Sequence, residues 1–290
     1  MKIEKLTYIN EQGESIVFSH KSIYHTNEVS GLSGIRNAIY AVNSMGQDGD
    51  TYLGGRIESR DIEITGSINT RKKEEMLEYR RRLNRVLNPK FSATLVYEFG
   101  DFKRIIDCKV NADTFQRKYV FQDFTIQLIC HNPFWREEFE DKVDIAAWIG
   151  GLEYILEIPE ETGMQMGYRE PSLIVNVYNE GDVQSGIRVE FRAIGTVKNP
   201  SILNVETQEF IKFNNLAMVA GDILTVSTYY GRKEVTLLRD GVLSDAFRYL
   251  DVDSTYIQLE VGDNLFRYDA ESNRDGVEVS IYHDNNFLGV

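Results

Sequence analysis

Apolar residues recur at every second position over long stretches of the chain, which is the period of a β-strand with one buried face. In the first half, this alternation runs through residues 62–68 and 124–130. In the second half, it runs through residues 187–193, 257–261 and 277–281. Turns rich in Gly, Asn and Asp separate the stretches. The pattern predicts a mainly β protein whose second half is an antiparallel sandwich.

Residues 70–87 break this pattern, because their apolar positions recur at intervals of three and four. The segment contains no Gly or Pro, Thr70 can cap its start, and Asn88-Pro89 ends it. We expect one long helix of about five turns here. The apolar stripe that must pack on the neighbouring sheet comprises Met76, Tyr79, Leu83, Val86 and Leu87.

Positive charge is concentrated in the C-terminal half of this helix, at Arg80, Arg81, Arg82 and Arg85. Such charge complements the negative end of the helix dipole. The simplest interpretation is a solvated face. The alternative is a contact with an acidic partner surface, such as another copy of this chain.

A change in composition after Trp135 predicts a boundary between two domains. Residues 136–144 contain five acidic side chains in nine, and glycine and proline are frequent from there up to Pro171. We therefore expect an N-terminal β-rich α+β domain at residues 1–135 and an acidic linker leading into the second domain at 136–171. The C-terminal β-sandwich is expected at 172–290.

Composition and charge narrow the class of protein. With 290 residues, 42% of them hydrophobic, the chain has ample material for two cores. The 45 Asp and Glu residues outnumber the 32 Lys and Arg, and the formal net charge of −13 argues against a basic nucleic-acid binder. No apolar run is long enough to cross a membrane, and the first residues lack the features of a signal peptide, so we expect a soluble protein made in a cytoplasm.

Local sequence motifs of enzymes are absent, including metalloprotease, nucleophile-elbow, phosphate-loop and dinucleotide-binding patterns. Two cysteines, Cys108 and Cys130, cannot form a disulfide framework and are expected to be small buried hydrophobic residues. Cys130 and His131 are adjacent, but neighbours on a strand point to opposite faces and cannot share a proton. We therefore expect no catalytic residue, no cofactor and no metal site.

Two segments remain as candidates for interactions. A polar loop contains Gly46 and Gly49, which permit positive φ or the close approach of another backbone, although it is equally interpreted as a plain surface loop. A second segment places two large aromatic side chains between an Asn-Pro turn and the acidic linker. These candidate anchors of the domain junction, or docking points for a neighbour, are Pro133, Phe134 and Trp135.

Taken in order, several motifs resemble the siphophage distal tail proteins, the Dit or phage tail component family. Those of the N-terminal domain are Gly46-Gln47-Asp48-Gly49, residues 60–68, the basic helix ending at Leu87-Asn88-Pro89, and residues 130–135. The second half resembles the galectin-like C-terminal sandwich of this family in Gram-positive phages and prophages. Its motifs are Asn199-Pro200, residues 209–212, Gly221-Asp222, residues 246–251 and Gly262-Asp263-Asn264.

The resemblance implies a structural virion component of the baseplate hub, and not an enzyme. Such proteins form a homohexameric ring at the end of the tail, with the N-terminal domains around a channel and the C-terminal domains outside. Implied partners are the tail tube, tape-measure and tail-associated fibre or lysin proteins, with a receptor-binding protein at the periphery. The protein would be made in the bacterial host cytoplasm and located at the virion tail tip, without a membrane contact. DNA would pass through the ring without being specifically bound, which the acidic charge favours.

A cyclic ring requires two different surfaces of each copy to meet. We expect the first domain to supply both surfaces. One combines strand edges at Ile62 and Ile64 with the loop residues Gly46, Gln47, Asp48 and Gly49. The other is the helix at Arg81 and Arg85. The competing hypothesis is that the second-half sandwich is a glycan-binding, lectin-like module for adsorption to the host surface.

Overall fold

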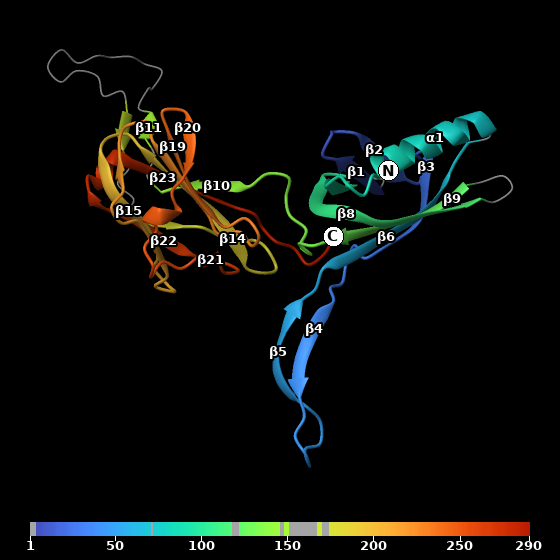
Figure 1. The fold of residues 1–290 in the computed structure, drawn as a ribbon, viewed down its shortest axis with the longest axis horizontal. Helices are drawn as coiled ribbons and strands as arrows, with labels where there is room; N and C mark the ends of the chain where they lie inside the picture. The colour runs from blue at the N-terminus through green and yellow to red at the C-terminus, as the bar shows by residue number, and fades with distance from the viewer. Residues whose placement is uncertain (1–3, 71, 118–121, 146–147, 151–166, 170–173) are drawn as a thin grey trace. The chain divides into compact units, whose positions relative to one another are not determined.

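The computed structural model describes residues 4–70, 72–117, 122–145, 148–150, 167–169 and 174–290. The chain divides into two compact units, each with its own core (Figure 1). Unit 1 comprises Met1–Glu138 and Phe287–Val290, and unit 2 comprises Phe139–Asn286. The chain therefore leaves unit 1 once and returns to it for its last residues.

Unit 1 contains most of its strands in one closed barrel of order β1-β2-β3-β6-β9-β8-β7. These strands are β1 (Glu4–Asn10), β2 (Ser15–Ser19), β3 (Tyr24–Ser30), β6 (Arg60–Ile68), β7 (Ala93–Phe99), β8 (Phe102–Arg117) and β9 (Gln122–Cys130). A separate two-stranded sheet is formed by β4 (Asn37–Val42) and β5 (Thr51–Ile57).

The barrel core is built from the alternating positions that the sequence predicts. Ile62, Ile64 and Ile68 of β6 are buried, and so are Phe124 and Leu128 of β9. These two strands pair antiparallel over their whole length. The prediction of strands with one buried face is confirmed for this part of the chain.

The helix α1 (Lys73–Val86) is the only α-helix in the described part of the chain, which confirms the prediction of a mainly β protein with one helix. It begins later than expected. Lys72 is the N-cap and uses no side-chain cap, whereas the Thr70 hydroxyl accepts the Lys72 N–H at 3.3 Å and donates to Glu75 at 3.0 Å. The last turn packs into the barrel core through Leu83 and Val86.

Unit 2 contains two main sheets that enclose one core, consistent with a sandwich. The larger has the order β10-β23-β14-β18-β19-β20, with β21 paired to β14, and the smaller has the order β13-β22-β15-β16, with β17 paired to β15. The larger sheet contains β10 (Asp141–Asp144), β14 (Ser185–Ala193), β18 (Ile223–Ser227), β19 (Glu234–Arg239), β20 (Val242–Asp245), β21 (Gln258–Leu259) and β23 (Val277–His283).

The smaller sheet contains β13 (Ile174–Asn176), β15 (Val197–Asn204), β16 (Phe210–Lys212), β17 (Ala217–Met218) and β22 (Leu265–Ser272). A further antiparallel pair is formed by β11 (Trp148–Gly150) and β12 (Gly167–Arg169). Two short 3-10 turns complete the unit, η1 (Phe247–Tyr249) and η2 (Arg274–Gly276). Phe191 from the larger sheet meets Phe213, next to β16, edge to face, with ring centroids 6.2 Å apart.

The expected boundaries need two corrections. Residues 141–144, expected within a linker, form the strand β10 and pair with β23. The last four residues, expected in the second domain, belong to unit 1. Both differences have one cause, because a strand at a sheet edge and a returning terminus are defined by distant pairing partners and not by local composition.

Candidate interaction site

The most exposed apolar surface of unit 1 is the hairpin at residues 37–57, which we call the arm. It consists of β4, β5 and the connecting loop, and it extends from the barrel as a ribbon of its own (Figure 1). Its large apolar side chains range from 37% exposed at Ile57 to 67% at Leu53, with Met45 fully exposed. These side chains are Ile39, Tyr40, Val42, Met45, Tyr52, Leu53 and Ile57.

Both faces of the arm carry apolar side chains. Residues directly opposite each other in an antiparallel pair share a face. The pairs Asn37↔Ile57 and Ala41↔Tyr52 therefore place Ile57 and Tyr52 on the face of Ile39, while Tyr40 and Val42 lie on the other face. An isolated two-stranded hairpin is only marginally stable in water, and it cannot bury two apolar faces by itself. Contiguous exposed apolar surface of this kind marks an interaction site.

The loop at the tip of the arm has the geometry that its glycines allow. Gly46 and Gly49 have φ of 86° and 80°, a left-handed conformation that favours glycine. The Gln47 side chain donates to the Thr51 hydroxyl at 3.0 Å. Asp48 and Asp50 are exposed and make no ion pair within the described residues. A role of Gly46 to Gly49 in a subunit interface stays a prediction, now at the tip of an exposed arm.

The root of the arm is fixed by one buried cation, Arg60, at the start of β6. Its guanidinium donates five hydrogen bonds, all to backbone carbonyls. The acceptors, at 2.6 to 3.2 Å, belong to Gly31, Leu32, Gly34, Pro133 and Leu288. Burial lowers the pKa of Arg60 from its ordinary value, but a guanidinium stays protonated at physiological pH. A single side chain thereby joins three segments that have few ladder hydrogen bonds of their own.

Trp135 completes this anchor from the other side. It is fully buried, and its indole N–H donates to the Leu32 carbonyl at 3.0 Å. Its backbone pairs with that of Phe287, where the chain has returned to unit 1. Pro133 contributes the carbonyl that accepts from Arg60 Nε at 2.8 Å. Pro133 and Trp135 therefore support the arm root and the chain terminus within unit 1. For Phe134, which is half-buried, the role of junction anchor stays a prediction.

The expected strand edge at Ile62 and Ile64 is wrong. Both side chains are completely buried in the barrel, and β6 has a hydrogen-bonded neighbour on each side, β3 and β9. Barrel closure removes the free edge that an open sheet would have offered. Neither residue has surface to present to another subunit.

Of the four arginines in the basic half of α1, three contact other parts of unit 1 and one is exposed without such a contact in the described residues. Arg85 forms an ion pair with Glu14 at 2.8 Å, Arg82 donates to the Ser15 carbonyl at 3.3 Å, and Arg80 lies over the Phe115 ring. Within the described residues, Arg81 makes no such contact and is exposed. Of the two arginines expected at an interface, only Arg81 is uncommitted.

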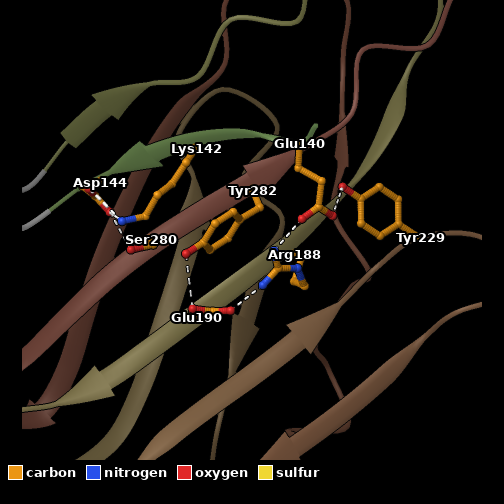
Figure 2. Close-up of polar contacts among 8 residues, drawn as sticks. All are labelled: Glu140, Lys142, Asp144, Arg188, Glu190, Tyr229, Ser280 and Tyr282. Carbon is orange, nitrogen blue, oxygen red and sulfur yellow. Dashed lines mark hydrogen bonds and ion pairs between the residues drawn. The ribbon is translucent and has the colours of Figure 1, made fainter. Parts of the chain in front are cut away.

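Unit 2 holds a different polar cluster, on the outer face of its larger sheet (Figure 2). Arg188 stacks on Tyr282, 3.9 Å from the ring centroid, and forms ion pairs with Glu140 and Glu190. The Tyr229 hydroxyl donates to Glu140 at 3.1 Å. Burial opposes the charge on Arg188, but the carboxylates outweigh it, and the pKa of Arg188 is raised. Beside this group, Lys142 pairs with Asp144 at 2.9 Å, so both charged neighbours are committed within the sheet (Figure 2).

The sequence carried one overlooked signal for the anchor. The alternation through Ile62 and Ile64 places Arg60 on the same, inward face of the strand, where an arginine requires partners. For the arm, alternation gives no signal, because neither of its faces is buried. Among the described residues, no group of His, Cys, Asp and Glu is arranged to hold a metal ion. No helix in the same residues is long and apolar enough to span a bilayer.

Two family models match the chain. The model for a phage tail protein RIFT-related domain matches residues 11–130, and the model for the C-terminal domain of a siphovirus-type tail component matches residues 180–287. Occurring in this order, one in each unit, the two domains define a structural component of a siphophage tail. The chain belongs to the distal tail protein, or Dit, family of siphophages.

Solved structures share this fold along the whole chain. The Dit protein of phage SPP1, described as a paradigm of the hub adsorption apparatus in phages infecting Gram-positive bacteria, has a TM-score of 0.72 and 14% identity. The match covers 98% of this chain and 99% of that one. A chain of the phage P2 baseplate in its activated conformation has a TM-score of 0.58 with Ca and 0.57 with Sr, at 12% identity and complete coverage of both chains. No curated protein matches this sequence.

Proposed function

We propose that this protein is a structural hub at the distal end of a siphophage tail, where six copies close into a ring through unit 1. Unit 2, with a galectin-like sandwich, lies outside the ring. The ring joins the tail tube and tape-measure proteins on one side to the fibre or lysin protein on the other, and it offers peripheral attachment to a receptor-binding protein. The protein is made in the host cytoplasm and performs no catalysis.

The observation that carries this proposal is the arm. Its two apolar faces are exposed in a single copy, and covering them is favourable by roughly 25 cal/mol for each Å² removed from water. Since the barrel is closed, the arm also provides the exposed strand edges of unit 1 through β4 and β5. A neighbouring copy that receives the arm supplies both the apolar burial and the backbone partners.

A ring needs a second, different surface on each copy, and α1 offers charge that suits the arm tip. Arg81 is exposed and unpaired in the described part of unit 1, while Asp48 and Asp50 at the tip are acidic and exposed. Unlike charges on two patches of one chain favour head-to-tail contacts over isologous pairs. We propose that the tip of one copy meets the α1 surface of the next.

The arm is tested by the mass of the full chain in solution, measured by light scattering and negative-stain imaging. We expect a six-chain ring for the wild type and single chains for a variant that combines Ile39→Asp with Leu53→Asp. Val252→Asp is the matched control, because Val252 is 98% exposed in unit 2 and should leave the ring intact. A wild type that stays monomeric, or an arm variant with the full six-chain mass, would contradict the proposal.

The charge contact is tested separately. Arg81→Glu should weaken the ring, whereas Arg85→Glu should act mainly within its own copy, because it breaks the ion pair with Glu14. Combining Arg81→Glu with Asp48→Arg should restore part of the assembly at low salt, where exposed charges are least screened. Restoration by neither this pair nor the equivalent pair with Asp50→Arg would remove α1 from the interface.

Passage of DNA without binding follows from the charge. Each chain carries a formal charge of −13. If part of this charge lines the bore, it repels phosphate, whereas a basic bore would hold DNA by releasing counterions. We expect no measurable binding of duplex DNA in a mobility assay at ~150 mM salt. A glycan array probed with the full chain should likewise give no hits; a specific hit would instead support the lectin-like alternative.

A further inference from the structure

The two cysteines of this protein lie on neighbouring strands of the barrel, Cys108 in β8 and Cys130 at the end of β9. In the antiparallel ladder between β8 and β9, Lys109 pairs with Ile129 and Val110 pairs with Leu128. The ladder pairing ends there, and the same register continued by one residue would place Cys108 opposite Cys130. On their other sides, Cys108 pairs with Ala93 on β7 and Cys130 pairs with Arg60 on β6.

Both thiols lie on the inward face of the barrel. Cys108 and Cys130 are buried and belong to the same hydrophobic core, whereas Lys109 between the buried Cys108 and Val110 is exposed. Directly opposite residues in an antiparallel pair have Cα atoms about 4.5 to 5.5 Å apart, depending on the hydrogen-bonding position. A disulfide spans Cα separations of about 4.4 to 6.8 Å. Opposite strand positions therefore meet the Cα distance requirement of a disulfide without a change of register.

We propose that Cys108 and Cys130 form a cross-strand disulfide when the protein meets an oxidant, and that this bond locks the barrel. The host cytoplasm keeps thiols reduced, and a virion component later encounters an oxidising medium. The bond would join β8 to β9, directly beside the Arg60 anchor of the arm root.

The oxidant in this reaction is a small-molecule disulfide such as oxidised glutathione, which reacts by thiol–disulfide exchange. One cysteine loses its proton to solvent, and its thiolate attacks a glutathione sulfur, which breaks the glutathione disulfide and releases one glutathione thiolate. The other cysteine, also deprotonated, then attacks the mixed disulfide and releases the second glutathione. Two protein thiols are oxidised, and one oxidised glutathione is reduced to two glutathione molecules.

Burial controls when this exchange can occur. Burial raises the pKa of the Cys130 thiol to about 12, although nearby Arg60 opposes the rise, and it raises the pKa of Cys108 well above its ordinary value. Thiols in the closed barrel are therefore protonated and out of reach of the oxidant. The exchange requires an open barrel, during folding or a transient opening, after which closure protects the bond from reduction.

The test uses the full-length wild type, incubated with oxidised glutathione in mild denaturant and in parallel with a thiol reductant. After alkylation and digestion, we expect the oxidised sample to lose both free thiols together and to yield one linked peptide pair containing Cys108 and Cys130. The melting temperature of the oxidised protein should exceed that of the reduced protein by about 5 to 10 °C, because a loop of some twenty residues is closed. Without denaturant, the same reaction should be much slower.

The single variants Cys108→Ala and Cys130→Ala provide the controls. Each should retain one free thiol or carry one glutathione, and each should lose the oxidant-dependent rise in melting temperature. Two free thiols in the oxidised wild type, a separate glutathione on each cysteine, or a bond between two chains would each overturn the proposal. Ring assembly is not needed for any of these readouts, so this test is independent of the proposed hub function.

Discussion

Arg60 in unit 1 and Arg188 in unit 2 both join separate segments of the chain, but they bind different kinds of acceptor. Each holds segments together at the place where the chain enters or leaves its unit. Arg60 is 4% exposed and bonds only to neutral backbone carbonyls. The Arg188 side chain is 27% exposed, stacks on Tyr282 and pairs with the carboxylates of Glu140 and Glu190.

The difference follows from what each arginine must join. Irregular segments such as residues 31–34 lie outside the strand ladders, and the donor fork of a guanidinium can bind several of their carbonyls. The strand β10 already has ladder hydrogen bonds to β23, so Arg188 needs only to connect side chains across the sheet. Dependence on burial, salt and pH should therefore differ between the two units.

The largest effect is expected for Arg60→Met. It removes five hydrogen bonds to backbone carbonyls in a buried place, and Gly31, Gly34 and Pro133 lose the arginine as their donor. We expect a cost of about 3 to 5 kcal/mol in the free energy of unfolding of unit 1. Hydrogen exchange should rise at residues 31–34 and at the C-terminus. Arg60→Lys should rescue only part of the loss, because an ammonium lacks the planar fork. Unchanged exchange at these segments would show that Arg60 is not their anchor.

The next effect concerns Gly31, whose carbonyl accepts from Arg60. A Cβ at this residue would lie 2.0 Å from the Asp61 carbonyl oxygen, so Gly31→Ala should displace backbone and cost about 3 kcal/mol. Gly34 has nearly the same positive φ, but a Cβ there would meet nothing within 4 Å. Gly34→Ala should therefore cost only the conformational strain, about 1 to 2 kcal/mol. Equal losses for the two variants in urea unfolding would disprove the close-approach argument.

Low pH should reduce the folding stability of unit 2 more than that of the segments held by Arg60. Burial opposes ionisation of Asp222, but hydrogen bonds from Arg239 and from the Val219 N–H outweigh it, so the pKa of Asp222 lies below its ordinary value. A carboxyl whose pKa is lower in the folded state stabilises the fold above its ordinary pKa, and this contribution is lost as the pH falls below about 4. We expect about 1 to 2 kcal/mol from this source.

The matched variant is Asp222→Asn, which should lose stability at neutral pH and flatten the acid dependence of unit 2. Chemical unfolding at several pH values, followed by exchange in unit 2 peptides, measures this. The Arg60 contacts should show no comparable dependence, because their acceptors are carbonyls and do not titrate. Equal acid loss in residues 31–34 and in unit 2 would break the comparison.

The smallest effect is expected for Arg188→Met. Its ion pairs are partly exposed to solvent, which limits their contribution to about 1 kcal/mol and makes it sensitive to salt. Exchange of the β10 amides should increase in the variant at low salt, and the difference from wild type should shrink at high salt. For Arg60→Met, the corresponding difference should not change with salt. A loss at Arg188 as large as that at Arg60 would contradict the assignment of burial as the deciding factor.

Much of the architecture could be predicted from local patterns. The alternation through Ile62, Phe124 and Val189 identified strands whose inward faces are buried, and the three-and-four spacing identified α1. The predicted start of the helix was wrong, because the Thr70 hydroxyl bonds to the Glu75 side chain and does not cap the first turn. The prediction of a free strand edge at Ile62 and Ile64 was wrong, because a strand shows the same alternation of apolar residues in an open sheet and in a closed barrel.

The amino-acid sequence was sufficient to specify which segments are strands and which one is a helix, because periodic burial leaves a repeat in the side chains. The family resemblance came from the order of the motifs along the chain. Barrel closure, the projecting arm, the return of residues 287–290 and the carbonyl partners of Arg60 emerged only in three dimensions. Their physical basis is pairing between backbone groups far apart in the chain, and a backbone carbonyl is the same in every residue.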